Sequence, residues 1–295
     1  MAVWRAADAF SSAQCAPRVV PDRREWHARL SLRFERAGAR TILARQEHEG
    51  PLLVQKVLYP EGPCRAQAIV LHPPGGIAAG DHLCVDVTAR ADAHALITAP
   101  GATKWYRSGG SDAASSACLV VGPHGALEWL PREAIVFDGA RLQARLAIDV
   151  AAQGCAIGWE IWCLGRIASG ERWRQGRIAL ETKLRVAGRL RWEERGVLTS
   201  DSALLGDAAG YAGYPVHGTL WAAGPEASRA LLDACRGVKL EGDGRGAVTQ
   251  LPQLLLARYL GKSTEAAFQW FATIWALLRP EYLGCEAVRP RIWNV

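Results

Sequence analysis

Residues 26–34, WHARLSLRF, alternate apolar and polar side chains without a break. The apolar residues share one face of an extended chain: Trp26, Ala28, Leu30, Leu32 and Phe34. The polar residues between them share the opposite face. A period of two residues is typical of a β-strand that buries one side. The stretch therefore predicts a half-buried strand at the start of the folded region.

The same alternation returns along the chain. It occurs at residues 83–89, 116–121, 141–150, 156–162 and 177–186. Glycine- and proline-containing turn sequences separate these runs. Short strands at this spacing indicate a mainly β domain. We find no repeat of fixed period, so the pattern alone predicts neither a propeller nor a regular solenoid.

The last quarter of the sequence mixes strands and helices. Strands are predicted at 216–222 and 254–260, and helices at 224–237 and 262–280. For the first helix, Pro225 suits the first turn and Gly237 the stop. For the second, Ser263 or Thr264 can cap the start and Pro280 is expected to end it.

Composition limits the possible function classes. The chain has 295 residues, 49% of them hydrophobic, and a net charge of +6. Its arginines are spread along the sequence rather than gathered in one stripe, which argues against a nucleic-acid binder. The eight cysteines form no CxxC pair, and no apolar run is long enough for a signal peptide or a membrane span. We expect a cytoplasmic protein with reduced thiols, with a mobile arm at 1–25 and a single domain at 26–295.

A nucleotide site is not expected at residues 260–264, LGKST. The stretch resembles the end of a P-loop, but Leu256 stands where the first glycine of the loop is required. Gly261 then reads as a turn residue and Lys262 as a solvated side chain.

Three other segments carry candidate chemistry. HPPGGIAAGD (72–81) is a stiff loop in which His72 could bind a metal or act as a base, and Asp81 could instead accept hydrogen bonds from the loop. Lys104 and Arg107 flank two aromatic residues, a pattern that fits a partner-binding patch or a nucleic-acid module. The acids Glu128, Glu133 and Asp138 could serve a hydrolase or lie at strand ends.

Several segments together resemble the UreD (UreH) family of urease accessory proteins. They are HPPGGIAAGD (72–81), TAPGATKWYR (98–107), GALEWLPREAIVFDGAR (125–141), LGRIASGERWRQG (164–176), RYLGKST (258–264), ALLRP (276–280) and PRIW (290–293). They run in order from about residue 25 to the end of the chain.

The resemblance implies a particular fold and a role that is not enzymatic. The family fold is mainly β, a helicoidal, β-helix-like stack of sheets with two α-helices near the C-terminus. The implied role is a scaffold and metallochaperone that inserts nickel into apo-urease. The implied partners are a UreF-like helical protein, a UreG-like GTPase and apo-urease, with nickel supplied by a UreE-like protein. Neither nucleic acid nor a membrane is expected as a partner.

The resemblance also suggests a water-filled internal tunnel for Ni²⁺ in transit, with no cofactor bound tightly. Ni²⁺ binds imidazole and thiolate strongly, so a conduit favours carboxylates and water. We expect no stable metal site, and the transit candidates are Asp81, Glu128, Glu133, Asp138 and Glu171. The residues expected to shape the tunnel or bind partners are His72, Pro73, Pro74, Gly75, Gly76, Gly101, Lys104, Tyr106, Arg107 and Trp270.

Overall fold

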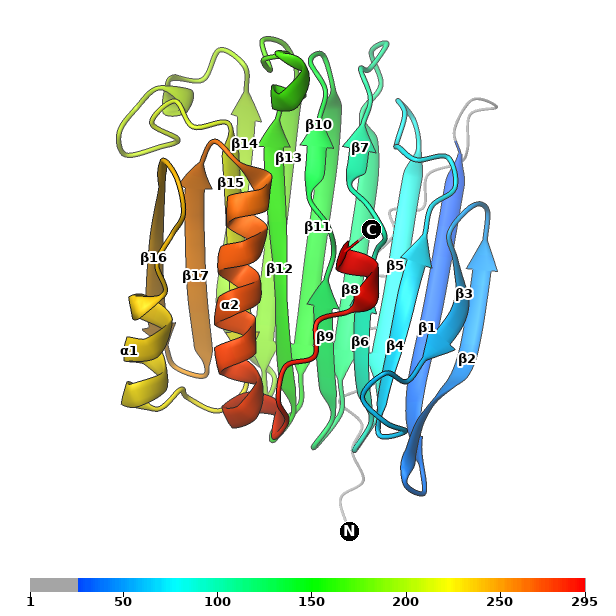
Figure 1. The fold of residues 1–295 in the computed structure, drawn as a ribbon. Helices are drawn as coiled ribbons and strands as arrows, with labels where there is room; N and C mark the ends of the chain where they lie inside the picture. Colours follow the sequence, from blue (N-terminus) through cyan, green and yellow to red (C-terminus); the bar gives the residue numbers. More distant parts are fainter. Residues whose placement is uncertain (1–25, 295) are drawn as a thin grey trace.

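The structure, a computed structural model, describes residues 26–294, so the arm expected at 1–25 lies outside the described residues. Two β-sheets lie face to face, and two α-helices cover the outer face of one of them (Figure 1). This confirms the mainly β, solenoid-like fold. Among residues 26–294 no disulfide joins any cysteine, and no helix is long and apolar enough to span a membrane.

The seven-stranded sheet has the order β14-β13-β11-β8-β5-β1-β2. Its strands are β1 (His27–Ala37), β2 (Arg40–Glu49), β5 (His82–Ala89), β8 (Ala113–Val121), β11 (Arg141–Val150), β13 (Arg177–Val186) and β14 (Arg189–Thr199). The ten-stranded sheet follows the path β16-β17-β15-β12-β9-β6-β4-β3, with β7 and β10 attached beside β12. Its strands are β3 (Leu53–Leu58), β4 (Arg65–Leu71), β6 (His94–Thr98), β7 (Thr103–Trp105), β9 (Ala126–Leu130), β10 (Ala134–Val136), β12 (Cys155–Leu164), β15 (Val216–Ala223), β16 (Gly244–Leu251) and β17 (Leu254–Gly261).

The chain passes back and forth between the two sheets in its central part. From β4 to β13 it visits them in turn, and neighbouring strands in each sheet run parallel. This is the winding of a β-solenoid, in which each turn of the chain stacks on the one before. Antiparallel strands pair at both ends of the stack, where β2 and β14 border one sheet and β3 and β16 the other.

The connections at the two ends of the solenoid differ in length. At one end, turns of four residues lead from the seven-stranded to the ten-stranded sheet, at 90–93, 122–125 and 151–154. The third residue of each turn has a positive φ: Asp92, His124 and Gln153. At the other end, longer crossovers lead back, at 72–81, 99–112, 131–140 and 165–176. We call this second end the crossover end.

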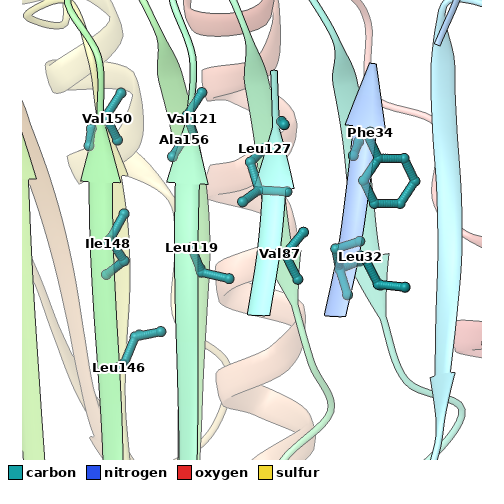
Figure 2. Close-up of a cluster of buried hydrophobic side chains, with 14 of the residues drawn as sticks. Leu32, Phe34, Val87, Leu119, Val121, Leu127, Leu146, Ile148, Val150 and Ala156 are labelled. Atoms are coloured by element: carbon teal, nitrogen blue, oxygen red, sulfur yellow. The ribbon is translucent and has the colours of Figure 1, made fainter. Parts of the chain in front are cut away.

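The main core lies between the sheets. One cluster of buried side chains there includes Leu32 and Phe34 of β1, Leu127 of β9 and Ala156 of β12 (Figure 2). The alternation expected for residues 28–34 is confirmed, because Ala28, Leu30, Leu32 and Phe34 are all buried. Trp26 is the exception. It precedes β1 and is 57% exposed, because it lies beyond the edge of the packed strands.

A second core lies outside the ten-stranded sheet, under helix α2 (Thr264–Leu283) and helix α1 (Arg229–Gly237). Ser263 caps α2, as expected, by accepting a hydrogen bond from the backbone N–H of Ala266 at 3.1 Å. Two predicted boundaries are wrong. Pro280 lies inside α2, because losing one N–H in the last turns does not break a helix packed on a sheet. The helix ends at Leu283 and is capped by Gly284, which has a left-handed φ. Helix α1 begins after Ser228, whose side chain caps it, and not at Pro225.

Short 3-10 turns complete the elements: η3 (Ile167–Ser169), η4 (Ala203–Leu205) and η5 (Arg291–Asn294). The last of these, at the C-terminal end of the described chain, places Trp293 against Trp159, Phe268 and Trp275. This aromatic cluster fixes the end of the chain on the outer face of the ten-stranded sheet.

Candidate functional site

The segments singled out in the sequence gather at the crossover end. Successive crossovers are joined by backbone hydrogen bonds: Ile77 N–H donates to Lys104 O at 2.7 Å, Thr103 N–H to Glu133 O at 2.9 Å, and Gly139 N–H to Gln175 O at 2.8 Å. Because parallel strands bring equivalent loops to the same end of a sheet, the four crossovers stack side by side. They form one continuous surface.

The first crossover is held by its own backbone. Gly75 adopts φ +74° and its N–H donates to His72 O at 2.9 Å. The carboxylate of Asp81 accepts a hydrogen bond from the backbone N–H of Ala78 at 2.8 Å, as the sequence suggested. Gly76 packs so tightly on the Tyr106 ring that no side chain fits there. Pro73 and Pro74 are exposed. The loop is therefore stiff, and it is fixed to the next crossover.

The second crossover displays its charges. Lys104 is exposed, and the side chain of Arg107 is 71% exposed. Tyr106 packs edge-on against Phe137 of the third crossover, with ring centroids 5.2 Å apart. Gly101 is also exposed. The aromatic residues thus join the loops, while the basic side chains face solvent.

Two of the expected transit acids hold the fourth crossover in place. Asp138 Oδ1 accepts hydrogen bonds from the backbone N–H groups of Arg174 at 2.6 Å and Gln175 at 2.8 Å. Glu171 pairs with the Arg166 guanidinium at 2.8 Å, and this contact is the main reason that its pKa falls to about 2. Both carboxylates therefore have structural partners. Glu133, in the third crossover, forms an ion pair with Arg132 at 3.6 Å.

Glu128 lies in a different place, buried on β9 beneath α2. Its oxygens accept hydrogen bonds from His94 Nε2 at 2.7 Å, Trp275 Nε1 at 2.6 Å, and Arg279 Nε and Nη2, both at 3.0 Å. Burial alone would raise the pKa of Glu128, but the bonds from His94 and Arg279 lower it to about 2. Glu61 pairs with the far side of the Arg279 guanidinium at 2.8 Å. The network ties α2 to the sheet and leaves Glu128 no free face for the acid pair of a hydrolase.

A cavity of about 410 Å³ opens into the space between the sheets near the first two crossovers. His72, Gly75, Gly101 and Lys104 contribute to its lining. Burial lowers the pKa of His72, an effect that Asp81 partly offsets. Deeper in, Trp129 and Glu160 form part of the wall.

A second cavity, of about 470 Å³, lies between the sheets near β14 and β17. Its wall includes His217, Thr219, Glu194 and Arg258. Glu160 and Trp162 line both cavities, so the two hollows adjoin at these side chains of β12. Together they extend between the sheets from the first crossovers to the edge of the stack.

Glu160 lies at the junction of the two cavities. Protein atoms surround Glu160 on all sides. Its side chain is nevertheless only half-buried, because part of its surface faces the cavities. Burial raises its pKa to about 7. Glu160 pairs with Thr219 of the neighbouring strand β15, and His217 lies two residues before Thr219. Burial lowers the pKa of His217 to about 4. Sequence reasoning missed both residues. A glutamate inside the apolar run AIGWEIW was the one available signal.

Two further expectations can be compared with the structure. We expected Trp270 to bind a partner or shape the tunnel, but its side chain is buried and is not open to a partner. Its ring is 5% exposed, packs beside Tyr259 and over Gly246, and donates from Nε1 to Val238 O at 3.1 Å. The reason is that β16 and the link after α1 wrap around that side of the helix. Lys262 is solvated as expected, and it pairs with Asp243.

Comparison with known proteins identifies the family. The model of the family described as UreD urease accessory protein matches residues 27–294. This chain belongs to that family. A UreD-family relative from Dechloromonas aromatica (strain RCB), named urease accessory protein UreD, is 50% identical over 272 residues, which cover 91% of this chain and 94% of the relative. Relatives of the same name from Azoarcus sp. (strain BH72) and Nitrosococcus oceani are each 49% identical over 269 residues, 91% of this chain and 94% and 90% of theirs.

The UreD-family description concerns an accessory protein and not an enzyme, which confirms that part of the sequence prediction. Within residues 26–294, no three His, Cys, Asp or Glu side chains gather closely enough to hold a metal ion.

Proposed function

We propose that this chain acts in urease maturation by letting Ni²⁺ pass between its two sheets on the way to apo-urease. The single observation that carries the proposal is the pair of adjoining cavities that share Glu160 and Trp162. In a protein core, packing normally leaves few voids larger than a water molecule. Two hollows of this size, with carboxylates in their walls, are therefore candidates for a hydrated passage.

The ligand chemistry of the walls suits transit. Ni²⁺ is held strongly by clusters of imidazole and thiolate, whereas carboxylates and water exchange more readily. The polar wall offers the carboxylate of Glu160 and one imidazole in each cavity, His72 in the first and His217 in the second, whereas Glu194 is paired with Arg258. A pKa of about 7 lets Glu160 alternate between the ionised form, which binds the ion, and the protonated form, which releases it.

The acids expected from the sequence take a different part in this proposal. Asp81, Asp138 and Glu171 hold backbone N–H groups of the crossovers, and Glu128 anchors α2. Their contribution is to shape the passage. Binding of the ion falls to Glu160, for which no hydrogen bond or ion pair is found among residues 26–294, whereas Glu194 is paired with Arg258. The stiff loops at 72–76 and 100–104 form the mouth of the first cavity.

The partners follow from the family resemblance. The proposed complex contains a UreF-like helical protein, a UreG-like GTPase and apo-urease, with nickel supplied by a UreE-like protein in the cytoplasm. In it, Ni²⁺ is cargo and not a resident cofactor.

The test is add-back to cells that express the cognate urease genes and lack only this chain. The wild-type chain restores urease activity and nickel content. Glu160→Gln, which keeps the shape and removes the charge, lowers both. Asp201→Asn, at an exposed turn, is the matched control and leaves them unchanged. Full nickel loading by Glu160→Gln would show that the passage does not depend on this carboxylate. Failure of the wild-type chain would refute the maturation role itself.

A further inference from the structure

A hollow of about 450 Å³ lies at the crossover end, between the fourth crossover and the loop that precedes β15. Its apolar lining includes Leu164, Trp173 and Leu205, and its basic lining includes Arg172, Arg174 and Lys262. Glu160 is not among its lining residues, so this groove is distinct from the two cavities between the sheets. We propose that the groove binds an acidic segment of a partner protein in urease maturation.

The local backbone explains why two arginines face outward. In the sequence RWR, the middle residue Trp173 is 8% exposed and anchors the loop in the core. Asp138 holds the backbone of Arg174 by accepting its N–H at 2.6 Å. Neighbouring side chains in an extended segment point to opposite sides, so burial of Trp173 directs Arg172 and Arg174 to the surface. Both residues are exposed.

These arginines are not neutralised by the described part of the chain. Among residues 26–294, no carboxylate lies within ion-pair distance of Arg172 or Arg174. Glu171, which also lines the groove, is occupied by Arg166. Lys262, on the opposite wall, already pairs with Asp243. The groove thus presents two guanidinium groups that lack an anionic partner beside an apolar floor.

A protein segment fits this chemistry better than nucleic acid does. Single-stranded nucleic acid needs exposed aromatic faces for base stacking. Here the Trp173 ring is buried, and the Arg245 guanidinium lies 5.8 Å from the centre of the Tyr214 ring. An apolar floor with arginines at its rim instead matches a peptide that carries both carboxylates and apolar side chains, since arginine binds carboxylates with two parallel hydrogen bonds.

The inference rests on the proposed function only for the source of the segment, among urease and its maturation proteins. Binding itself can be measured with the purified chain. The probe is a short synthetic peptide of alternating glutamate and leucine, labelled for fluorescence anisotropy. We expect the wild-type chain to bind it in a salt-sensitive manner and Arg172→Glu/Arg174→Glu to bind at least about tenfold more weakly, because charge reversal adds repulsion.

The matched control is Arg189→Glu/Arg229→Glu, which changes the net charge equally. Arg189 follows the β13–β14 turn and Arg229 begins α1, so both lie away from the groove, and both are exposed. The control keeps wild-type peptide affinity. A milder pair, Arg172→Gln/Arg174→Gln, together with thermal melting, separates loss of binding from loss of folding. This pair also weakens binding, while its melting temperature stays that of the wild-type chain.

Three results would overturn the inference: no peptide binding by the wild-type chain, equal binding by the groove variants, or binding of a single-stranded oligonucleotide in place of the peptide with the same arginine dependence. In cells, the double Glu variant is expected to lose co-purification with the urease maturation proteins. Peptide binding depends on neither nickel nor urease, so its outcome is independent of whether Glu160 carries the ion.

Discussion

The buried guanidinium of Arg279 is the group whose removal we expect to destabilise the fold most. It donates to the Glu128 carboxylate with two bonds of 3.0 Å and to Glu61 with bonds of 2.8 and 3.1 Å. The side chains of Arg279 and Glu128 are both fully buried. In Arg279→Met, an apolar side chain fills most of the same space, and Glu128 loses its cationic partner.

The magnitude follows from the cost of leaving a buried charge without its partner, which is about 3–5 kcal/mol. His94 and Trp275 still donate to Glu128 in the variant, so we expect a value near the lower end. For a domain of this size, about 3 kcal/mol corresponds to a fall in melting temperature of roughly 6–12 °C. Glu128→Gln combined with Arg279→Met also removes the buried negative charge that Arg279→Met leaves without its partner. The loss of unfolding free energy in the double variant should therefore be smaller than the sum of the two single losses by about 1–3 kcal/mol.

The assay is urea unfolding of the purified chain, followed by tryptophan fluorescence, on the wild type, the two single variants and the double variant. The double-mutant cycle isolates the coupling between the two side chains. If Arg279→Met loses less than about 1 kcal/mol, or if the two changes simply add, the network does not carry the stability assigned to it.

Three further predictions concern pH and packing. The pKa of Glu128 is lowered from 4.5 to about 2, so its contribution to the free energy of unfolding is complete above pH 4.5 and is lost as the pH falls toward 2. Urea titrations should therefore show that stability falls less steeply between pH 4.5 and pH 2 in Glu128→Gln than in the wild type. Gly158→Ala should unfold or strongly destabilise the chain in thermal melts, because its Cβ would meet the Trp221 ring and lie 2.8 Å from Trp129 O. Nickel transfer in a reconstituted maturation assay should rise between pH 6 and pH 8 and lose part of that rise in Glu160→Gln, since the ionised fraction of a group of pKa about 7 grows from about one tenth to about nine tenths.

The alternating strands of the seven-stranded sheet were predictable because they bury one face in the space between the sheets. The ranges 141–150 and 177–186 match β11 and β13, with alternate residues buried along most of their length. Strands such as β9 and β10 were missed because α2, the chain end or a crossover covers their second face, which removes the alternation. In a strand with both faces buried, periodicity carries no signal.

The solenoid repeat is present in the structure although no fixed period is visible in the sequence. The short turns recur with a left-handed residue in the third place, at Asp92, His124 and Gln153, but three different residue types occupy it. The crossovers between them vary in length, from 131–140 to 99–112. Repetition in such a chain lies in the backbone conformation and strand pairing, which a search for repeated letters does not detect.

The candidate site, too, was predictable only in part. Sequence reasoning located the crossovers because glycines and prolines concentrate in them, but it did not foresee that Asp138 and Glu171 would have partners inside the loops. A carboxylate that follows a stiff loop has backbone N–H groups within reach, and Asp81 and Asp138 bind them. Glu160, in contrast, stands in an otherwise apolar run, and only the packing of the opposite sheet reveals the hollow it faces.

At the crossover end, carboxylates lie inside the loops and arginines face solvent, because the carboxylates bind groups of the loops themselves. The carboxylates have partners inside the loops: Asp138 accepts hydrogen bonds from two backbone N–H groups, and Glu171 pairs with Arg166. Arginine has no acceptor atom and cannot take that inward position on N–H groups, so Arg172 and Arg174 extend to solvent. The surface of these loops thereby becomes basic on the outside, and Arg172 and Arg174 line the groove at the fourth crossover where an acidic partner would bind.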